Sequence, residues 1–162
     1  MSMSSSLVLF NVISKNVIAP IVYTSVSEIT INIMKIKSYK SKTLDIKTKI
    51  DELDLIYKIT IINDYINDID EVIVNKKFIN YAITGIVEVL EIIKKDVELL
   101  YKELDYLNNS WHYTTIGWIY YYEKIDINKL KNNISILESR FEMLIKLLMT
   151  HNKNNDKLLI TS

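Results

Sequence analysis

The 162-residue chain has no cysteine, one proline and two glycines. The absence of cysteine excludes disulfide bonds, thiolate nucleophiles and cysteine-ligated zinc. The scarcity of glycine and proline leaves little material for tight turns or for loops that wrap phosphate groups. The composition therefore argues against all-β and Rossmann-type folds.

The chain also lacks an excess of charge of either sign, because 20 Lys and Arg residues balance 20 Asp and Glu residues. A nucleic-acid-binding domain normally has a basic excess, so we expect no nucleic-acid partner. A net charge near zero gives little electrostatic protection against self-association. We therefore expect a protein partner or a second copy of the chain.

Few side chains have the patterns that catalysis or metal binding requires. His112 and His151 are the only histidines, and neither has a second ligand at helical spacing. The serines lack a nucleophile-elbow glycine pattern. The neighbouring acids Asp51, Glu52 and Asp54 are most simply a solvated helix face. We expect no enzymatic activity, metal, cofactor or small-molecule substrate.

Apolar residues recur at helical spacing, most clearly over residues 79–107. Steps of three and four collect them on one face of an α-helix. The opposite face is charged, with Glu91 and Lys95 at a favourable i,i+4 spacing. A helix with two such different faces must pack its apolar stripe against other helices. The stripe is Ile79, Ile83, Ile86, Leu90, Ile93, Val97, Leu100, Leu104 and Leu107.

The same spacing predicts three further helical segments, and we expect a break over residues 67–77. Thr43 or Asp45 can cap the second segment, and Asp126 can cap the last. The apolar positions are Ile18, Val22, Val26, Ile29, Ile33 and Ile36 in the first, Ile46, Ile50, Leu53, Leu55, Ile59, Ile62, Ile66 and Ile69 in the second, and Ile127, Leu130, Ile134, Leu137, Phe141, Leu144 and Leu148 in the last.

The stretch over residues 17–36 is ambiguous. Ile29, Ile31 and Ile33 alternate with polar residues as in a strand. We favour a helix, because its neighbours are helical and a lone strand would have no partner. Pro20 is expected to kink or split this helix.

Four helical segments with short connections predict an all-α fold, an antiparallel four-helix bundle over residues 1–150. Residues 151–162 are polar and are expected to form a disordered tail.

The first 14 residues contain no charge. They lack the basic start and cleavage site of a signal peptide, and Lys15 and Glu28 interrupt the apolar run before the ~20 residues that span a bilayer. We expect a core helix, with insertion into a membrane or binding to a partner as the alternative. The candidate contact residues are Leu7, Leu9, Phe10 and Ile13, beside a basic patch of Lys35, Lys37, Lys40 and Lys42.

Both tryptophans fall in the aromatic stretch over residues 109–124. Trp111, Trp118 and Tyr121 have large side chains whose burial would contribute strongly to packing. We expect them to close one end of the bundle, and a partner-binding surface is the alternative.

The C-terminal half resembles a known family. Asn109-Ser110-Trp111 follows the long amphipathic helix, and Gly117-Trp118 leads through a tyrosine run to Asp126 and Lys129-Leu130. This order resembles the four-helix N-terminal domains of cell-death proteins, namely the fungal HeLo and related NLR domains and the MLKL bundle. The resemblance covers mainly residues 80–150. It implies a non-enzymatic, cytoplasmic protein that self-assembles and uses its N-terminal helix against lipid.

The sequence leaves a second function open. The chain is also consistent with a soluble interaction adaptor or viral decoy, such as a Bcl-like apoptosis or innate-immunity regulator, with no membrane activity. Binding to vesicles and the oligomeric state separate the two.

Overall fold

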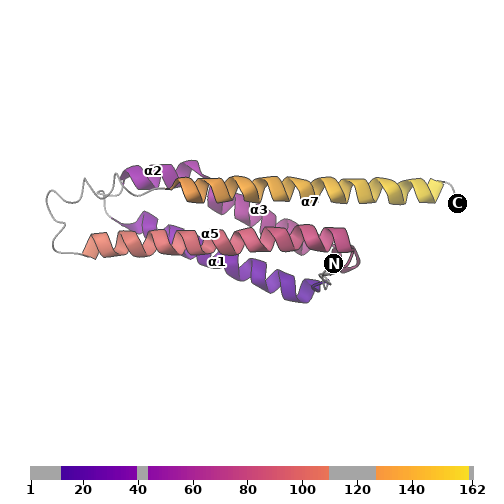
Figure 1. The fold of residues 1–162 in the computed structure, drawn as a ribbon, viewed down its shortest axis with the longest axis horizontal. Coiled ribbons are helices and arrows are strands. Elements are labelled where there is room, and N and C mark those ends of the chain that lie inside the picture. Colours follow the sequence, from indigo (N-terminus) through magenta and orange to yellow (C-terminus); the bar gives the residue numbers. More distant parts are fainter. Residues whose placement is uncertain (1–11, 40–43, 110–126, 161–162) are drawn as a thin grey trace, which may run out of the picture.

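The computed structural model describes residues 12–39, 44–109 and 127–160, and every regular element within these ranges is a helix (Figure 1). The predicted all-α class is confirmed, and residues 17–36 are helical. The helices are α1 (Lys15–Ser38), α2 (Leu44–Glu52), α3 (Leu55–Asp68), α4 (Glu71–Val74), α5 (Lys77–Asn109) and α7 (Asn128–Ile160).

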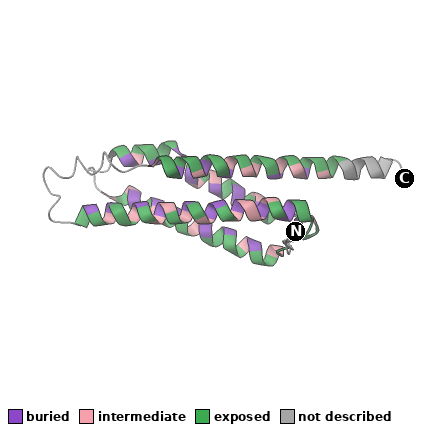
Figure 2. Ribbon diagram, in the orientation of Figure 1, coloured by how far each residue is buried: buried purple, intermediate pink, exposed green. Residues whose placement is uncertain are grey.

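Helix α5 is the centre of the molecule. All nine residues of its predicted apolar stripe are buried, and α5 packs against α1, α4 and α7. Figure 2 shows buried residues recurring along α1 and α5. The core is built almost entirely from isoleucine, leucine and valine, which lack polar atoms that would need partners.

Helices α1 and α5 run in the same direction (Figure 1). Side chains of α1 meet side chains of α5 at almost the same separation in residue number from one end to the other. Since each helix rises about 1.5 Å per residue, a constant offset means that the two helices advance together in one register. The pairs are Ser25–Glu91, Glu28–Lys94, Lys35–Tyr101 and Tyr39–Asp105, each 66 residues apart.

Helices α5 and α7 run in opposite directions. Phe78, near the start of α5, contacts the ring of His151, whereas Asp96 farther along α5 pairs with Lys129 at the start of α7. Antiparallel packing therefore describes α5 with α7 but not α5 with α1. The break before α5 explains this difference. The chain runs back through α2 and α3 and then reverses at the break, so α5 runs beside α1 in the same direction.

Lys15 fixes the start of α1 against the end of α3. Its ammonium nitrogen donates to the carbonyl oxygens of Asn67 at 2.5 Å and Ile69 at 2.6 Å. The last carbonyls of a helix have no partner within the helix and attract positive charge. The contact therefore satisfies the end of α3 while it positions the first turn of α1.

The second predicted segment is two helices, which corrects the expectation of one. Asp54 has a left-handed backbone with φ of 49° and separates α2 from α3. Aspartate tolerates this conformation better than most residues. The sequence signal was the two-residue step from Leu53 to Leu55, which a continuous helical stripe cannot contain.

Helix α1 continues through Pro20 without splitting. The proline is the sixth residue of the helix, and the helix continues although the main-chain bond from position 20 to the Asn16 carbonyl cannot form. The split form of the prediction is therefore wrong.

The expected break over residues 67–77 is present, and it contains the single turn α4, capped by Asp70 through a 2.8 Å bond from the Val72 amide. The last helix does not end at residue 150, as we expected, but runs to Ile160 and passes the start of α5 (Figure 1).

Two adjacent isoleucines of α5 test this packing. Ile93 is 0% exposed and Ile92 is 43% exposed. We expect Ile93→Ala to lower the free energy of unfolding by about 2–5 kcal/mol, because a cavity replaces the side chain. Ile92→Ala should change it by less than about 0.5 kcal/mol. Urea unfolding measures both, and equal effects would contradict the assigned face.

Candidate functional site

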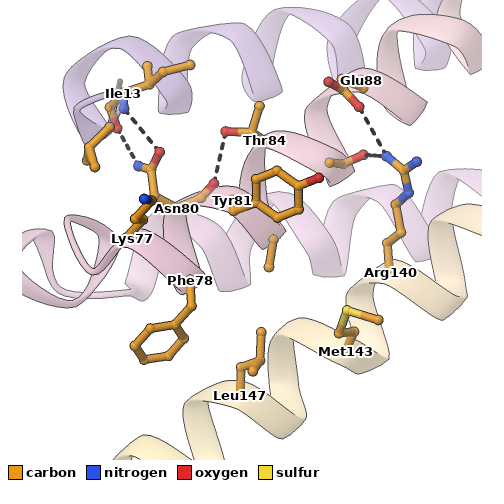
Figure 3. Close-up of a pocket in the computed structure, with 13 residues that line it drawn as sticks. Ile13, Lys77, Phe78, Asn80, Tyr81, Thr84, Glu88, Arg140, Met143 and Leu147 are labelled. Atoms are coloured by element: carbon orange, nitrogen blue, oxygen red, sulfur yellow. Dashed lines mark hydrogen bonds and ion pairs between the residues drawn. The ribbon is translucent and has the colours of Figure 1, made fainter. Parts of the chain in front are cut away.

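A groove of about 940 Å³ lies where the residues before α1 meet the start of α5 and the middle of α7. Figure 3 shows Ile13 at one end of the groove and Arg140 at the other. Phe78 and Tyr81 come from α5, and Met143 and Leu147 come from α7. The groove is thus formed by segments that are distant in the sequence.

Asn80 anchors one end of the groove. It is 4% exposed and lies in the first turn of α5. Its Nδ2 donates to the carbonyl oxygens of Ile13 at 2.6 Å and Val74 at 3.2 Å, and its Oδ1 accepts from the Ile13 amide at 3.0 Å. Replacing a buried amide that makes three hydrogen bonds is costly, because its partners are left unsatisfied. Asn80 therefore fixes the backbone that leads into α1.

Arg140 closes the other end. Its Nη1 donates to the carbonyl oxygen of Gly85 and lies 3.3 Å from Oε2 of Glu88. A Cβ atom at position 85 would lie 3.2 Å from Nη1, so glycine permits this close approach. The contact holds α7 against α5 at this level.

The middle of the groove is apolar and open to solvent. Val12, Ile13, Phe78 and Met143 are all exposed large apolar side chains, although they lie together. Isolated exposed apolar residues are ordinary, whereas a contiguous patch commonly marks a contact surface.

The outer face of α1 is a second apolar surface. Val17, Ile21, Ile31 and Met34 are exposed there, while other isoleucines and valines of the same helix are buried. Within the described ranges, α1 alone is long and apolar enough to cross a membrane, a test that core helices of soluble proteins also pass.

A polar cluster joins the middle of α1 to α5. Ser25 donates to Oε1 of Glu91 at 2.5 Å, and Lys94 lies 2.8 Å from Oε2 of the same carboxylate. Burial acts to raise the pKa of Glu91, but hydrogen bonds from Lys94 and Ser25 outweigh it and hold this pKa below its ordinary value of 4.5. The hydrogen bond to Glu91 in turn raises the pKa of Lys94 above 10.5. Glu91 thus pairs with Lys94, one residue before the expected Lys95.

The far end of α1 has a related contact. The Tyr39 hydroxyl donates to Oδ1 of Asp105 at 2.7 Å. The Tyr39 ring stacks on the Tyr101 ring, with 6.2 Å between the ring centres. Burial, together with the hydrogen bond to Asp105, raises the pKa of Tyr39 well above 10. This phenol stays neutral under ordinary conditions and donates a hydrogen bond to the carboxylate of Asp105.

The structure separates the predicted contact residues. Ile13 lines the groove before α1, whereas Lys35 and Lys37 lie near the other end of the helix, so the lysines are not beside Ile13 as we expected. Lys35 lies 5.0 Å from the centre of the Tyr101 ring, and Lys37 forms an ion pair with Asp51. Several predicted residues lie outside the described ranges: Leu7, Leu9, Phe10, Lys40, Lys42, Thr43, Trp111, His112, Trp118, Tyr121 and Asp126.

Our reading of the sequence missed the groove itself. Two signals were available, because Arg140 is the single arginine and Gly85 is one of two glycines in the chain. Asn80 was a third signal, since it lies among the apolar positions that begin α5. The pairing of these residues depends on the antiparallel register of α5 and α7, which spacing within one helix does not reveal.

Within the described ranges, no group of three or more His, Cys, Asp or Glu side chains is arranged to hold a metal ion. No protein-family model, curated protein or solved structure matches the chain.

Replacing Asn80 tests the anchor at the groove. We expect Asn80→Ala to lower the free energy of unfolding by about 1–3 kcal/mol, because the buried Val74 carbonyl loses its donor. Asn80→Asp should cost more, since a carboxylate would face two carbonyl oxygens. Asn75→Ala, at an exposed position, is the control and should cost less than about 0.5 kcal/mol. Equal urea midpoints for all three would contradict this role.

The Glu91 cluster predicts a pH dependence. A carboxylate whose pKa is lowered in the folded state stabilises the fold above its unfolded pKa and loses that contribution as the pH falls through the folded pKa. Lys94→Met should therefore destabilise the protein at pH 7, and its difference from wild type should shrink as the pH falls below 4.5. Lys102→Met, which removes an exposed pair with Glu98, is the control and should have little effect. Urea unfolding at pH 7 and pH 3 measures this, and a constant difference would refute it.

Proposed function

We propose that this protein is a non-enzymatic four-helix bundle of the cell-death signalling type that acts at a membrane surface through the outer face of α1. The proposed bundle consists of α1, the α2–α3 pair, α5 and α7. The observation that supports membrane contact is the exposed apolar face of α1, with Val17, Ile21 and Ile31.

Helix α1 carries large apolar side chains on both faces, although Thr24 and Glu28 are also exposed on the outer one. Its inner face is packed into the core, and its outer face carries further isoleucine and valine. A soluble surface helix normally has a polar outer face, whereas a helix that is apolar all round is covered by protein or lipid. This distribution favours an apolar cover on the outer side of α1.

The charged side chains near this face already have partners within the fold. Lys15 and Glu28 are the only charged residues in the stretch 12–34. Lys15 donates to carbonyl oxygens at the end of α3, and Glu28 lies 3.6 Å from Lys94. Contact with lipid along this stretch therefore requires little desolvation of unpaired charge. Binding should depend on apolar burial more than on attraction to anionic headgroups.

The second candidate is a soluble adaptor whose protein partner covers the same face. The ion pair between Lys37 and Asp51 favours it, because a paired lysine adds little attraction to anionic lipid. The adaptor needs no lipid, and vesicle flotation distinguishes it from the membrane-surface function.

Flotation with vesicles of phosphatidylcholine, with and without phosphatidylserine, tests the proposal. We expect binding to both, with less than about a threefold difference, because the apolar effect predominates. Ile21→Asn should weaken binding about tenfold, which corresponds to about 1.4 kcal/mol of lost apolar burial.

Ile61→Asn on α3 is the matched control, because Ile21 and Ile61 are each 39% exposed. It should leave vesicle binding unchanged. Absence of binding to both vesicle types, with one stable species by light scattering, would reject membrane engagement and favour the adaptor. Equal effects of the two substitutions would show that α1 is not the contact face.

A further inference from the structure

The apolar groove described above begins at the point where the chain enters α1. Val12 and Ile13 themselves line it, so the residues immediately before them start at its edge. Those residues lie outside the described ranges. They include Leu7-Val8-Leu9-Phe10, four consecutive large apolar side chains in a stretch without charge.

Asn80 restricts how the chain reaches the groove. Its amide bonds both the N–H and the carbonyl of Ile13, which fixes the main chain at this residue. A segment leaving a fixed point remains close to it, so its effective concentration over the neighbouring surface is high. A segment of the same chain therefore has an advantage over any separate molecule.

The dimensions of the groove and segment agree. The α5 side of the groove extends from Lys77 to Glu88, which corresponds to about 17 Å at 1.5 Å per residue. The six residues from Leu7 to Val12 reach about 20 Å when extended. The segment can therefore pass along the groove from Ile13 toward Arg140.

The chemistry of the two surfaces also agrees. Phe78 and Met143 offer exposed apolar area on opposite sides of the groove, from α5 and α7. The charged side chains of Arg140 and Glu88 pair with each other at the far end, and Lys77 is the other charged lining residue, at the end next to Ile13. The apolar surface between these two ends suits an uncharged apolar segment.

We propose that Leu7–Phe10 of the same chain dock in the groove between the start of α5 and α7. The docked segment covers Phe78 and Met143 and holds its own apolar side chains away from solvent. Any partner that binds the groove or the apolar side chains of the segment must first displace the segment from the groove. The docking does not require membrane binding, so the two proposals fail separately.

Disulfide trapping tests the docking, because the chain has no cysteine of its own. Leu9→Cys is combined with Met143→Cys in the groove or with Met149→Cys outside it. Met143 is 58% exposed and Met149 is 56% exposed, so the two thiols on α7 are equally accessible. Oxidised glutathione accepts the two electrons when the thiols join, and gel mobility separates monomers from dimers. No lipid is present.

We expect the Leu9–Met143 pair to form an intramolecular disulfide at least tenfold faster than the Leu9–Met149 pair, at a rate independent of protein concentration. Equal rates would overturn the proposal. Disulfide-linked dimers that increase with concentration would also overturn it, because the occupant would then be a second copy.

A second set of variants protects the test against local misfolding. Phe10→Cys replaces Leu9→Cys, and circular dichroism confirms that helix content is retained. Adding Leu7→Ser and Leu9→Ser to the Phe10→Cys and Met143→Cys pair should slow trapping at least fivefold, because the apolar docking contact is lost. An unchanged rate would show that the segment approaches the groove without docking in it.

Discussion

The burial of one apolar stripe on α5 is the constraint on which the rest of the fold depends. The stripe contacts α1 on one side and α7 on the other, so a single helix organises both neighbours. Burial of apolar surface does not depend on direction and by itself allows neighbouring helices to slide. The fold therefore needs further contacts that choose one register, and these are the few polar pairs at the edges of the stripe.

Those polar contacts are spread along the whole length of α1. Asn80 holds Ile13 at the start, Glu91 accepts from Ser25 in the middle, and Asp105 accepts from a tyrosine at the end. Each is partly shielded from water, where a hydrogen bond is electrostatically stronger than at the surface. Together they select the register, and the apolar residues between them supply most of the packing. This division leaves the outer face of α1 without a structural role in the fold.

The sequence predicted helices well and their pairing poorly, for a physical reason. Spacing reports which residues share a face of one helix, so the buried stripe of α5 and the helical state of residues 17–36 were both predictable. Spacing carries no information on which helix covers that face. The parallel contact of α1 with α5 and the register of α5 with α7 were therefore missed, and with them the groove. The break at Asp54 was readable in principle from the step between Leu53 and Leu55.

The constant offset between α1 and α5 has a consequence for how this chain can change in length. One residue inserted within either helix would rotate everything beyond it by about 100° and advance it by about 1.5 Å. The contacts on the far side of the insertion would then face the wrong way, while those on the near side stayed in place. Insertions and deletions are consequently tolerable only outside the paired stretches, and not between Ser25 and Tyr39 or between their counterparts on α5.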